Sequence, residues 1–275
     1  MPFPYKTVLI TGATSGIGQA LAERMIASGV FVIAIGRRKE RLDDLVKKHG
    51  SDKVAAEPFD ISDLSALPNW VKHITTTYPK LDSIVLNAGL QKTLLFTKPE
   101  TIDLAAHSTE LTTNYLSPLH LITLFLPHLI SLSPQPTSII VVSSCLSLIP
   151  LPRCANYCAT KAATHSLVWS LRAQLTGPEA EHTKHIKVIE ILPPAVKTEL
   201  HKIQKDLVEQ GQGDFGMELD EFADFTWGEL EKGDGPDGRD EITVKETREW
   251  VEMDHKRREV FEGYVRGCRE GGMKF

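Results

Sequence analysis

A chain of 275 residues with 41% hydrophobic and 24% charged residues has the composition of a soluble globular protein with a sizeable core. The 31 Lys and Arg against 36 Asp and Glu give a formal net charge of −5, so we expect no nucleic-acid partner. No signal peptide, membrane-length apolar stretch, disulfide framework or metal-ligand spacing is visible, which predicts a cytoplasmic protein with no membrane contact and no metal site.

Strand-like and helix-like segments alternate as far as about residue 200. Short β-rich or continuously apolar runs predict strands at residues 5–10, 30–35, 54–59, 83–86, 138–142 and 186–192. Helical spacing of apolar residues predicts a first helix that ends at Gly29. The same spacing predicts further helices at residues 39–48, 64–77, 103–130 and 157–175. This alternation implies right-handed β-α-β crossovers, and hence a three-layer, Rossmann-type, doubly wound parallel α/β sheet.

The last part of the chain is less regular. Residues 231–240 are rich in Gly and Asp and resemble a linker, residues 241–244 predict a short last strand, and a charged helix runs to about Arg266. A single domain with a variable C-terminal portion fits this pattern better than two domains.

A glycine cluster, TGATSGIG at residues 11–18, lies between the first predicted strand and the first helix. A doubly wound fold binds the pyrophosphate of a dinucleotide at this point, where a helix N-terminus favours an anion and a Cβ would block close approach. The spacing of Gly12, Gly16 and Gly18 differs from the G-x-G-x-x-G of larger dehydrogenases. A tight turn without a ligand is the alternative interpretation.

The second predicted strand ends in Gly36, Arg37 and Arg38, with no acidic residue before Glu40. An acidic residue there would bind the ribose hydroxyls of NAD, whereas guanidinium groups suit the 2′-phosphate of NADP. The pattern favours NADP(H), and the alternative is that both arginines are solvated surface charges.

These segments together resemble the classical short-chain dehydrogenases/reductases over about residues 5–200. The matching pieces, each at an element boundary, are the glycine cluster, Asp60, Asn87-Ala88-Gly89, Asn114, Ser144 and the run YCATK at 157–161. More narrowly, LNAGLQK, YCATKAATHSLVWSLRAQL and VIEILPPAVKTEL look like the DltE-type subgroup.

The resemblance implies which residues hold NADP(H). Arg37 matches the position that selects NADP, Asp60 and Ile61 flank the adenine, and Pro194 stands where the family usually has glycine, which removes one backbone donor. The complete cofactor set is Gly12, Thr14, Ser15, Gly16, Ile17, Gly18, Arg37, Arg38, Asp60, Ile61, Asn87, Ala88, Gly89, Tyr157, Lys161, Val196 and Thr198.

Tyr157 and Lys161 are four residues apart and lie on one face of a helix. A phenol has a pKa of about 10, and a nearby ammonium and a cationic nicotinamide would lower it toward the range of a useful base. Ser144, at the end of a strand, is placed to hydrogen-bond the substrate oxygen, with Ser143 expected on the other face. By resemblance, Asn114 supports a proton-relay water near Lys161.

The resulting hypothesis is an NADP(H)-dependent oxidoreductase that acts on a small-molecule carbonyl or alcohol, and the resemblance adds a homodimer or homotetramer. The apolar loop at 145–155 favours a hydrophobic carbonyl compound, while Arg153 is either an anchor for an acidic group or a surface charge. Residues 1–200 would form the dinucleotide-binding and catalytic core. Residues 201–275 would add a substrate lid and the C-terminal strand and helix of the same domain.

Two questions stay open in the sequence. The apolar side chains at 201–240 either close over the pocket or pack in a subunit interface; they are Phe215, Met217, Phe222, Phe225 and Trp227. A non-catalytic NADP-binding sensor or partner-binding module on the same fold is the alternative function, which Pro194 favours weakly and the complete set of Ser144, Tyr157, Lys161 and Asn114 opposes.

Overall fold

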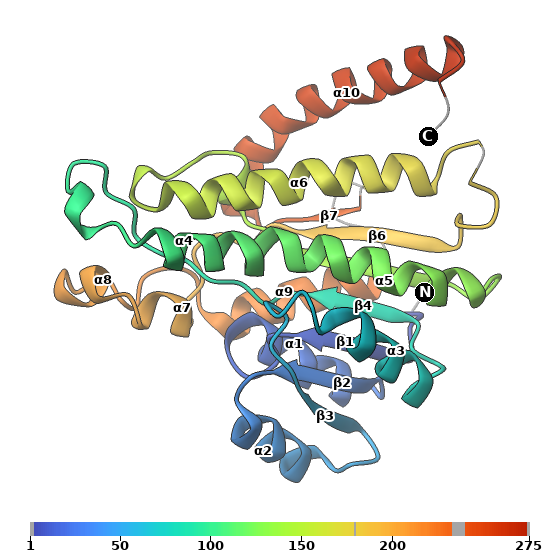
Figure 1. Cartoon of the computed structure of the whole chain (residues 1–275), viewed down its shortest axis with the longest axis horizontal. Helices are drawn as coiled ribbons and strands as arrows, with labels where there is room; N and C mark the ends of the chain where they lie inside the picture. The colour runs from blue at the N-terminus through green and yellow to red at the C-terminus, as the bar shows by residue number, and fades with distance from the viewer. Residues whose placement is uncertain (1–2, 179, 233–239, 274–275) are drawn as a thin grey trace.

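The computed structural model describes residues 3–178, 180–232 and 240–273, and within them seven strands form one parallel sheet. The strands are β1 (Thr7–Thr11), β2 (Phe31–Gly36), β3 (Val54–Pro58), β4 (Ser83–Leu86), β5 (Thr137–Val142), β6 (Ile186–Ile191) and β7 (Glu241–Ile242). Their order in the sheet is β3-β2-β1-β4-β5-β6-β7 (Figure 1). The predicted parallel α/β fold is confirmed, and each predicted strand lies within two residues of an observed one.

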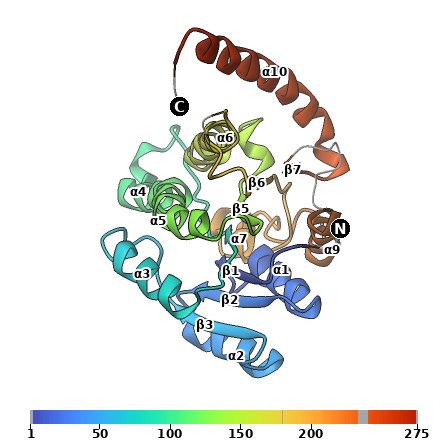
Figure 2. The same ribbon diagram turned by 90° about the vertical axis from the view of Figure 1, so that its right-hand side faces the viewer.

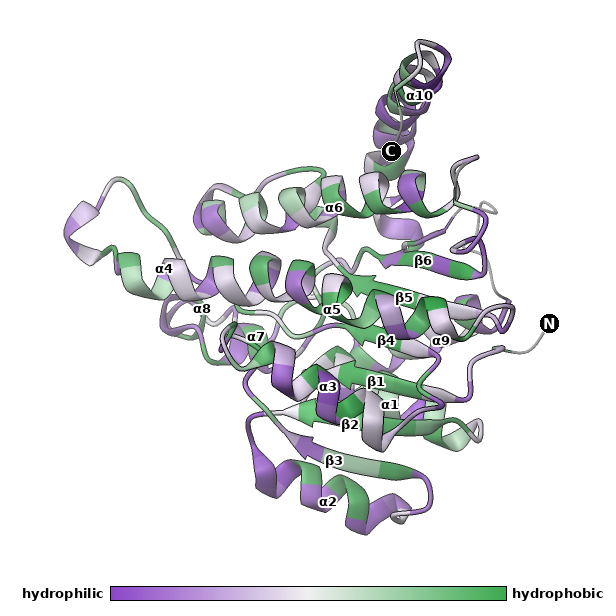
Figure 3. Cartoon of the chain, turned by 45° about the vertical axis from the view of Figure 1, so that its right-hand side comes forward, coloured by the Kyte–Doolittle hydropathy of each residue, from purple (hydrophilic) through white to green (hydrophobic). Residues whose placement is uncertain are grey.

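Helices cover both faces of the sheet, which makes three layers (Figure 2). The helices are α1 (Gly16–Ala27), α2 (Lys39–His49), α3 (Leu67–Thr77), α4 (Leu104–Leu111), α5 (Ser117–Ser131), α6 (Ala155–Leu175), α7 (Glu199–Lys202), α8 (Lys205–Glu209), α9 (Leu219–Lys232) and α10 (Arg248–Glu270). Because strand side chains alternate, Val8 and Ile10 face α1, α2 and α9, whereas Leu9 faces α3, α5 and α6. Figure 3 shows the strands as the hydrophobic centre and α2 and α10 as largely hydrophilic.

The long helix predicted over residues 103–130 is divided by a π-helical turn, Thr112–Leu116. Pro118 has no N–H to donate to the carbonyl of Asn114, four residues earlier. The Oγ1 atom of Thr164 donates to that carbonyl instead, at 3.1 Å. A proline and a hydroxyl from the neighbouring helix α6 therefore account for the interruption.

Residues 199–232 form three helices, α7, α8 and α9, that the sequence pattern did not indicate. Phe222 and Trp227 of α9 are buried against α1 and the N-terminal Phe3 in the core. They neither cover a pocket nor form an exposed interface, which corrects both interpretations of these aromatic residues. Phe215 is 40% exposed and stacks on His201.

The C-terminal portion adds an edge strand and a helix, as expected. β7 pairs in parallel with β6, and α10 runs four residues further than the predicted end at Arg266. Most of the linker-like stretch, residues 233–239, lies outside the described residues. No helix in the described part of the chain is long and apolar enough to cross a membrane.

Candidate active site

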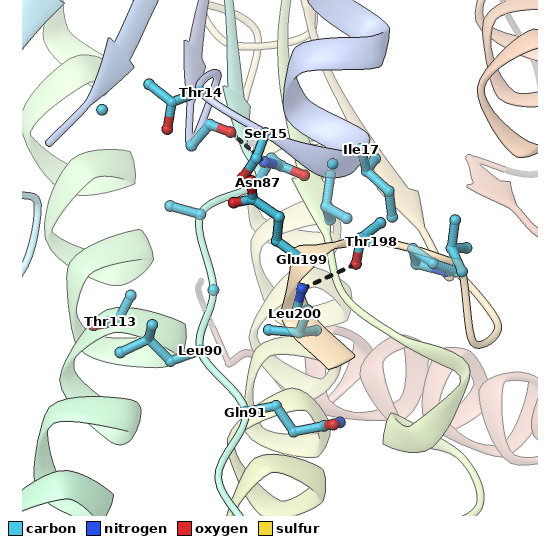
Figure 4. Close-up of a pocket in the computed structure, with 18 of the residues that line it drawn as sticks. Thr14, Ser15, Ile17, Asn87, Leu90, Gln91, Thr113, Thr198, Glu199 and Leu200 are labelled. Carbon is cyan, nitrogen blue, oxygen red and sulfur yellow. Dashed lines mark hydrogen bonds between the residues drawn. The ribbon is translucent and has the colours of Figure 1, made fainter. Parts of the chain in front are cut away.

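A pocket opens at the carboxyl ends of the central strands, where a doubly wound sheet holds its ligands (Figure 4). Among the described residues predicted for the site, Gly18 and Asn114 lie outside the lining of this pocket. The predicted residues that line it are Gly12, Thr14, Ser15, Gly16, Ile17, Arg37, Arg38, Asp60, Ile61, Asn87, Ala88, Gly89, Ser144, Tyr157, Lys161, Val196 and Thr198.

The glycine turn is shaped by its contacts with the end of β4. Gly12 has a φ of 70°, and a Cβ there would lie 2.9 Å from the Cα of Ala88. A Cβ on Gly18 would overlap the side chain of Asn87 and lie 2.5 Å from the carbonyl oxygen of Gly12. In this structure Gly12 and Gly18 are thus required by packing within the protein, a reason that differs from the close phosphate approach we expected.

Asn87 joins the two loops. Its Nδ2 donates to the carbonyl of Thr11 at 3.0 Å, and its backbone N–H donates to the Oγ1 of Thr11 at 3.0 Å. The Ala88 N–H donates to the same hydroxyl at 3.1 Å. Asn87 and Ala88 therefore hold the glycine turn in place through hydrogen bonds, and they also line the pocket.

The N-terminus of α1 faces the pocket and suits an anion. Ser15 precedes the helix in an extended conformation, and its side chain makes no capping hydrogen bond within the described residues. Gly16 follows with a φ of 55°. Uncapped N–H groups and the helix dipole favour a phosphate at such a place, so the turn fits a dinucleotide.

The two arginines after β2 behave differently. Arg37 is largely exposed and its Nη1 lies 3.8 Å from a carboxylate oxygen of Asp60. Arg38 donates to the hydroxyls of Ser15 at 2.7 Å and Thr14 at 2.9 Å, and it pairs with Glu199 at 2.7 Å. Arg38 is therefore the arginine attached to the glycine turn, whereas the family resemblance pointed to Arg37 as the residue that selects NADP.

Sequence reasoning missed Arg41 and Glu199, which complete this cluster. Arg41 donates to Glu199 at 2.5 Å and to the carbonyl of Thr14 at 3.2 Å. Its spacing of three residues from Arg38 would have placed it on the same face of α2. Glu199 gave no comparable signal, because its partners lie far away in the sequence.

Tyr157, Lys161 and Ser144 are gathered at the end of β5. Tyr157 and Lys161 are both buried, and the Lys161 Nζ lies 5.7 Å from the centroid of the Tyr157 ring. Lys161 donates to the carbonyl of Val142 at 2.8 Å. Ser144 lines the same pocket, and its hydroxyl influences the pKa of Tyr157. One pocket is thus lined by a phenol, an ammonium and a hydroxyl.

Burial dominates the ionisation of this group. It raises the pKa of Tyr157, while the hydroxyl of Ser144 opposes the rise. It also lowers the pKa of Lys161 to about 8, against the negative charge of Glu190. The pKa of Tyr157 is therefore raised in this structure, not lowered as we expected, because burial removes solvent from the phenol.

Ser143 also lines the pocket, contrary to the expectation that it points to the other face. The alternation of side chains does not reach it, because β5 ends at Val142. Its Oγ is buried and has no hydrogen-bond partner within the described part of the chain.

Asn114 lies in the π-helical turn, behind the pocket. Its Oδ1 accepts from the Leu90 N–H at 2.8 Å, and its Nδ2 donates to the Leu90 carbonyl at 2.9 Å and to Thr160 Oγ1 at 3.0 Å. A Cβ on Gly89 would lie 3.4 Å from Asn114 Oδ1 and 3.8 Å from Lys161 Nζ. The Asn114 side chain therefore positions the segment 89–90, which borders Lys161.

The loop after β6 contains Pro194 and carries Val196 and Thr198 into the lining. The Lys197 N–H donates to the carbonyl of Met217, and the Met217 N–H donates to the carbonyl of Ala195, both at 2.9 Å. The Oγ1 of Thr198 accepts from the Leu200 N–H at 3.3 Å and caps α7 (Figure 4).

The substrate side is held together by Arg153. Its guanidinium donates to Asp206 at 2.7 Å, to Gln204 at 2.5 Å and to Thr93 at 3.0 Å. Arg153 lies outside the lining of the pocket and ties the loop before α6 to the start of α8 and to Thr93. Among the described residues, no group of His, Cys, Asp and Glu side chains could hold a metal ion.

The model of the short chain dehydrogenase family matches residues 6–207. The chain belongs to this family. It is 36% identical over 234 residues to an uncharacterized oxidoreductase, DltE of Bacillus subtilis, covering 85% of this chain and 87% of that protein, which confirms the subgroup resemblance. It is also 31% identical to sulfoacetaldehyde reductase 2 of Chromohalobacter salexigens, covering 70% of this chain and 73% of that protein.

Solved structures show the same fold. A short chain dehydrogenase from Burkholderia cenocepacia in complex with NADP superposes with a TM-score of 0.72 at 25% identity, covering 96% of this chain and 99% of that chain. A short chain dehydrogenase/reductase from Burkholderia phymatum in complex with NAD has a TM-score of 0.72 at 17% identity, covering 84% and 88%. The protein is therefore an oxidoreductase of a family that uses nicotinamide cofactors.

Proposed function

We propose that the protein is an NADP(H)-dependent oxidoreductase that transfers a hydride between the nicotinamide and a small-molecule carbonyl or alcohol. The observation that carries this proposal is that Tyr157, Ser144 and Lys161 line the same pocket as the glycine turn. NADPH, when bound, supplies the hydride, and every other task falls to side chains of the chain itself.

In the direction of reduction, Tyr157 donates the proton of its hydroxyl to the carbonyl oxygen as negative charge develops there. Ser144 donates a hydrogen bond to the same oxygen, an interaction that strengthens in the transition state. Burial favours the neutral phenol, so Tyr157 carries the proton that it would donate in the unliganded protein. In the direction of oxidation, Lys161 and the positive charge of the oxidised nicotinamide would favour the phenolate that removes the proton.

Lys161 would also hold the nicotinamide ribose. Asn114 would keep Lys161 in position through the segment 89–90, which borders it. The family relation extends the role of Asn114 to a proton-relay water. Asp60 and Ile61 would flank the adenine, and Val196 and Thr198 would contact the nicotinamide. Each of these residues except Asn114 lines the pocket.

The preference for NADP(H) over NAD(H) follows from charge. Arg37, Arg38 and Arg41 stand at the rim of the glycine turn, and guanidinium groups bind a phosphate through paired, charge-assisted hydrogen bonds. The NADP complex of the similar Burkholderia cenocepacia protein agrees with this proposal.

The substrate class proposed is a hydrophobic carbonyl compound or the matching alcohol. Leu90, Leu200 and Ile203 add apolar surface to the lining of the pocket. The reductase from Chromohalobacter salexigens supports carbonyl reduction as the direction of interest. Residues 1–200 would act as the core and 201–275 as lid and C-terminal support, in a cytoplasmic homodimer or homotetramer.

A panel of aldehydes, ketones and alcohols, followed at the NADPH absorbance band, tests the activity. Fluorescence titrations with NADPH and NADH test the cofactor separately. We expect turnover of at least one carbonyl compound and tighter binding of NADPH. Binding of NADPH without turnover across the panel would favour the alternative of a non-catalytic sensor or partner-binding module.

A further inference from the structure

The carboxylate of Glu199 is held between two arginines at the rim of the candidate site. Arg38 Nη1 lies 2.7 Å from one oxygen, and Arg41 Nη1 lies 2.5 Å from the other. The same arginines also bind the glycine turn, Arg38 through Ser15 Oγ and Arg41 through the carbonyl of Thr14. Arg38 and Arg41 thus form an anion site beside the glycine turn, and the carboxylate of Glu199 occupies this site.

Glu199 belongs to the other side of the pocket. It is the first residue of α7, directly after Thr198, and Figure 4 shows its side chain extending from this segment toward Ser15. The next helix, α8, is held by the ion pair between Arg153 and Asp206. Residues 199–209, which we call the lid segment, are therefore attached to the glycine turn through Glu199 and to the loop before α6 through Asp206.

The ion pairs of Glu199 are suited to exchange. The hydrogen bond from Arg38 lowers the pKa of Glu199, so the carboxylate is charged at neutral pH. The three side chains are about two-fifths exposed, at 41% for Arg38, 45% for Arg41 and 39% for Glu199, and exposed ion pairs are individually weak. A phosphate monoester offers more charge and one more acceptor oxygen than a carboxylate, so it competes well for the same guanidinium groups.

We propose that Glu199 is an internal competitor for the 2′-phosphate of NADP(H). The phosphate displaces the carboxylate from Arg38 and Arg41, and this displacement releases the start of α7 from the glycine turn. Glu199 thereby sets the affinity for the phosphorylated cofactor and couples its arrival to the lid segment. The inference rests on the proposed function, in which NADP(H) is the cofactor.

The variant Glu199→Gln tests the competition, because glutamine keeps the size of the side chain and removes its charge. In fluorescence titrations we expect NADPH to bind about fivefold tighter than to the wild type, the scale of one or two exposed ion pairs, with NADH unchanged. Asp206→Asn is the matched control, since it breaks the ion pair of the lid segment with Arg153 and leaves both arginines with Glu199. Its affinity for NADPH should equal that of the wild type.

Hydrogen–deuterium exchange of residues 199–209 tests the coupling. Adenosine 2′,5′-bisphosphate should accelerate exchange in the wild type, whereas 5′-AMP should not. In Glu199→Gln the segment should exchange fast without any ligand. Unchanged or weaker NADPH binding in Glu199→Gln, while the wild type still prefers the bisphosphate to 5′-AMP, overturns this inference alone. No preference for the bisphosphate in either protein overturns the proposed cofactor as well.

Discussion

The Nε2 atom of His165 lies 2.9 Å from a carboxylate oxygen of Asp254, while its Nδ1 lies 2.8 Å from Glu190. All three residues are buried. His165 comes from α6, Glu190 from β6 and Asp254 from α10, so one imidazolium joins the C-terminal helix to the sheet. This is a structural histidine with both nitrogens satisfied.

This arrangement predicts a stability that falls in alkali. Burial alone would lower the pKa of His165, but the charges of Glu190 and Asp254 and their hydrogen bonds raise it to about 10. Because the pKa of His165 is higher in the folded than in the unfolded chain, protonated His165 stabilises the fold in full below the unfolded-state pKa of about 6.5. This stabilisation is lost as the pH rises through about 10.

His165→Gln should therefore lower the free energy of unfolding at pH 6 by about 3 kcal/mol, since it removes the cation between two buried carboxylates and leaves Asp254 with Arg257 alone. Urea unfolding at pH 6 and pH 10 measures the effect, which should shrink toward pH 10. An equal loss at both pH values would show that packing, not charge, is what His165 contributes.

Tyr157→Phe removes the proposed proton donor and keeps the ring. We expect kcat to fall at least about 100-fold, the usual contribution of a positioned acid, with the affinity for NADPH nearly unchanged. Steady-state rates on the first active carbonyl compound and a fluorescence titration give both numbers. Turnover at the wild-type rate would remove Tyr157 from the mechanism.

Much of this architecture follows from local pattern. Apolar runs and helical spacing predicted the strands and their flanking helices, because burial on both faces of a parallel sheet leaves a signature within a few residues. The family resemblance then placed Ser144, Tyr157 and Lys161 at element ends that meet in one pocket.

What the sequence did not show depends on distant contacts. Glu199 reaches the arginines after β2 only once the chain has folded, and α9 became visible as a helix only where Phe222 packs on α1. The end of β5 at Val142 decided where Ser143 points, and a one-residue difference in a strand end lies beyond what periodicity resolves.

Arg38 should matter more than Arg37 for the phosphorylated cofactor, since Arg38 is attached to the glycine turn and Arg37 is exposed beside Asp60. We expect Arg38→Gln to weaken NADPH binding about tenfold or more, the scale of a charged hydrogen bond, with little change for NADH. Arg37→Gln is the matched variant and should have a smaller effect. The reverse order in titrations would restore Arg37 as the selecting residue.

Asn114→Ala separates positioning from proton relay. The change removes two hydrogen bonds to the Leu90 backbone and one to Thr160, and it leaves the Leu90 N–H without its partner. An unsatisfied buried polar group costs about 1–3 kcal/mol, so we expect a loss of stability on that scale together with a lower kcat. Urea unfolding and steady-state rates of the same preparation measure both. A fall in kcat with unchanged stability would instead indicate that the segment 89–90 holds its place without Asn114, and that this residue acts through the relay alone.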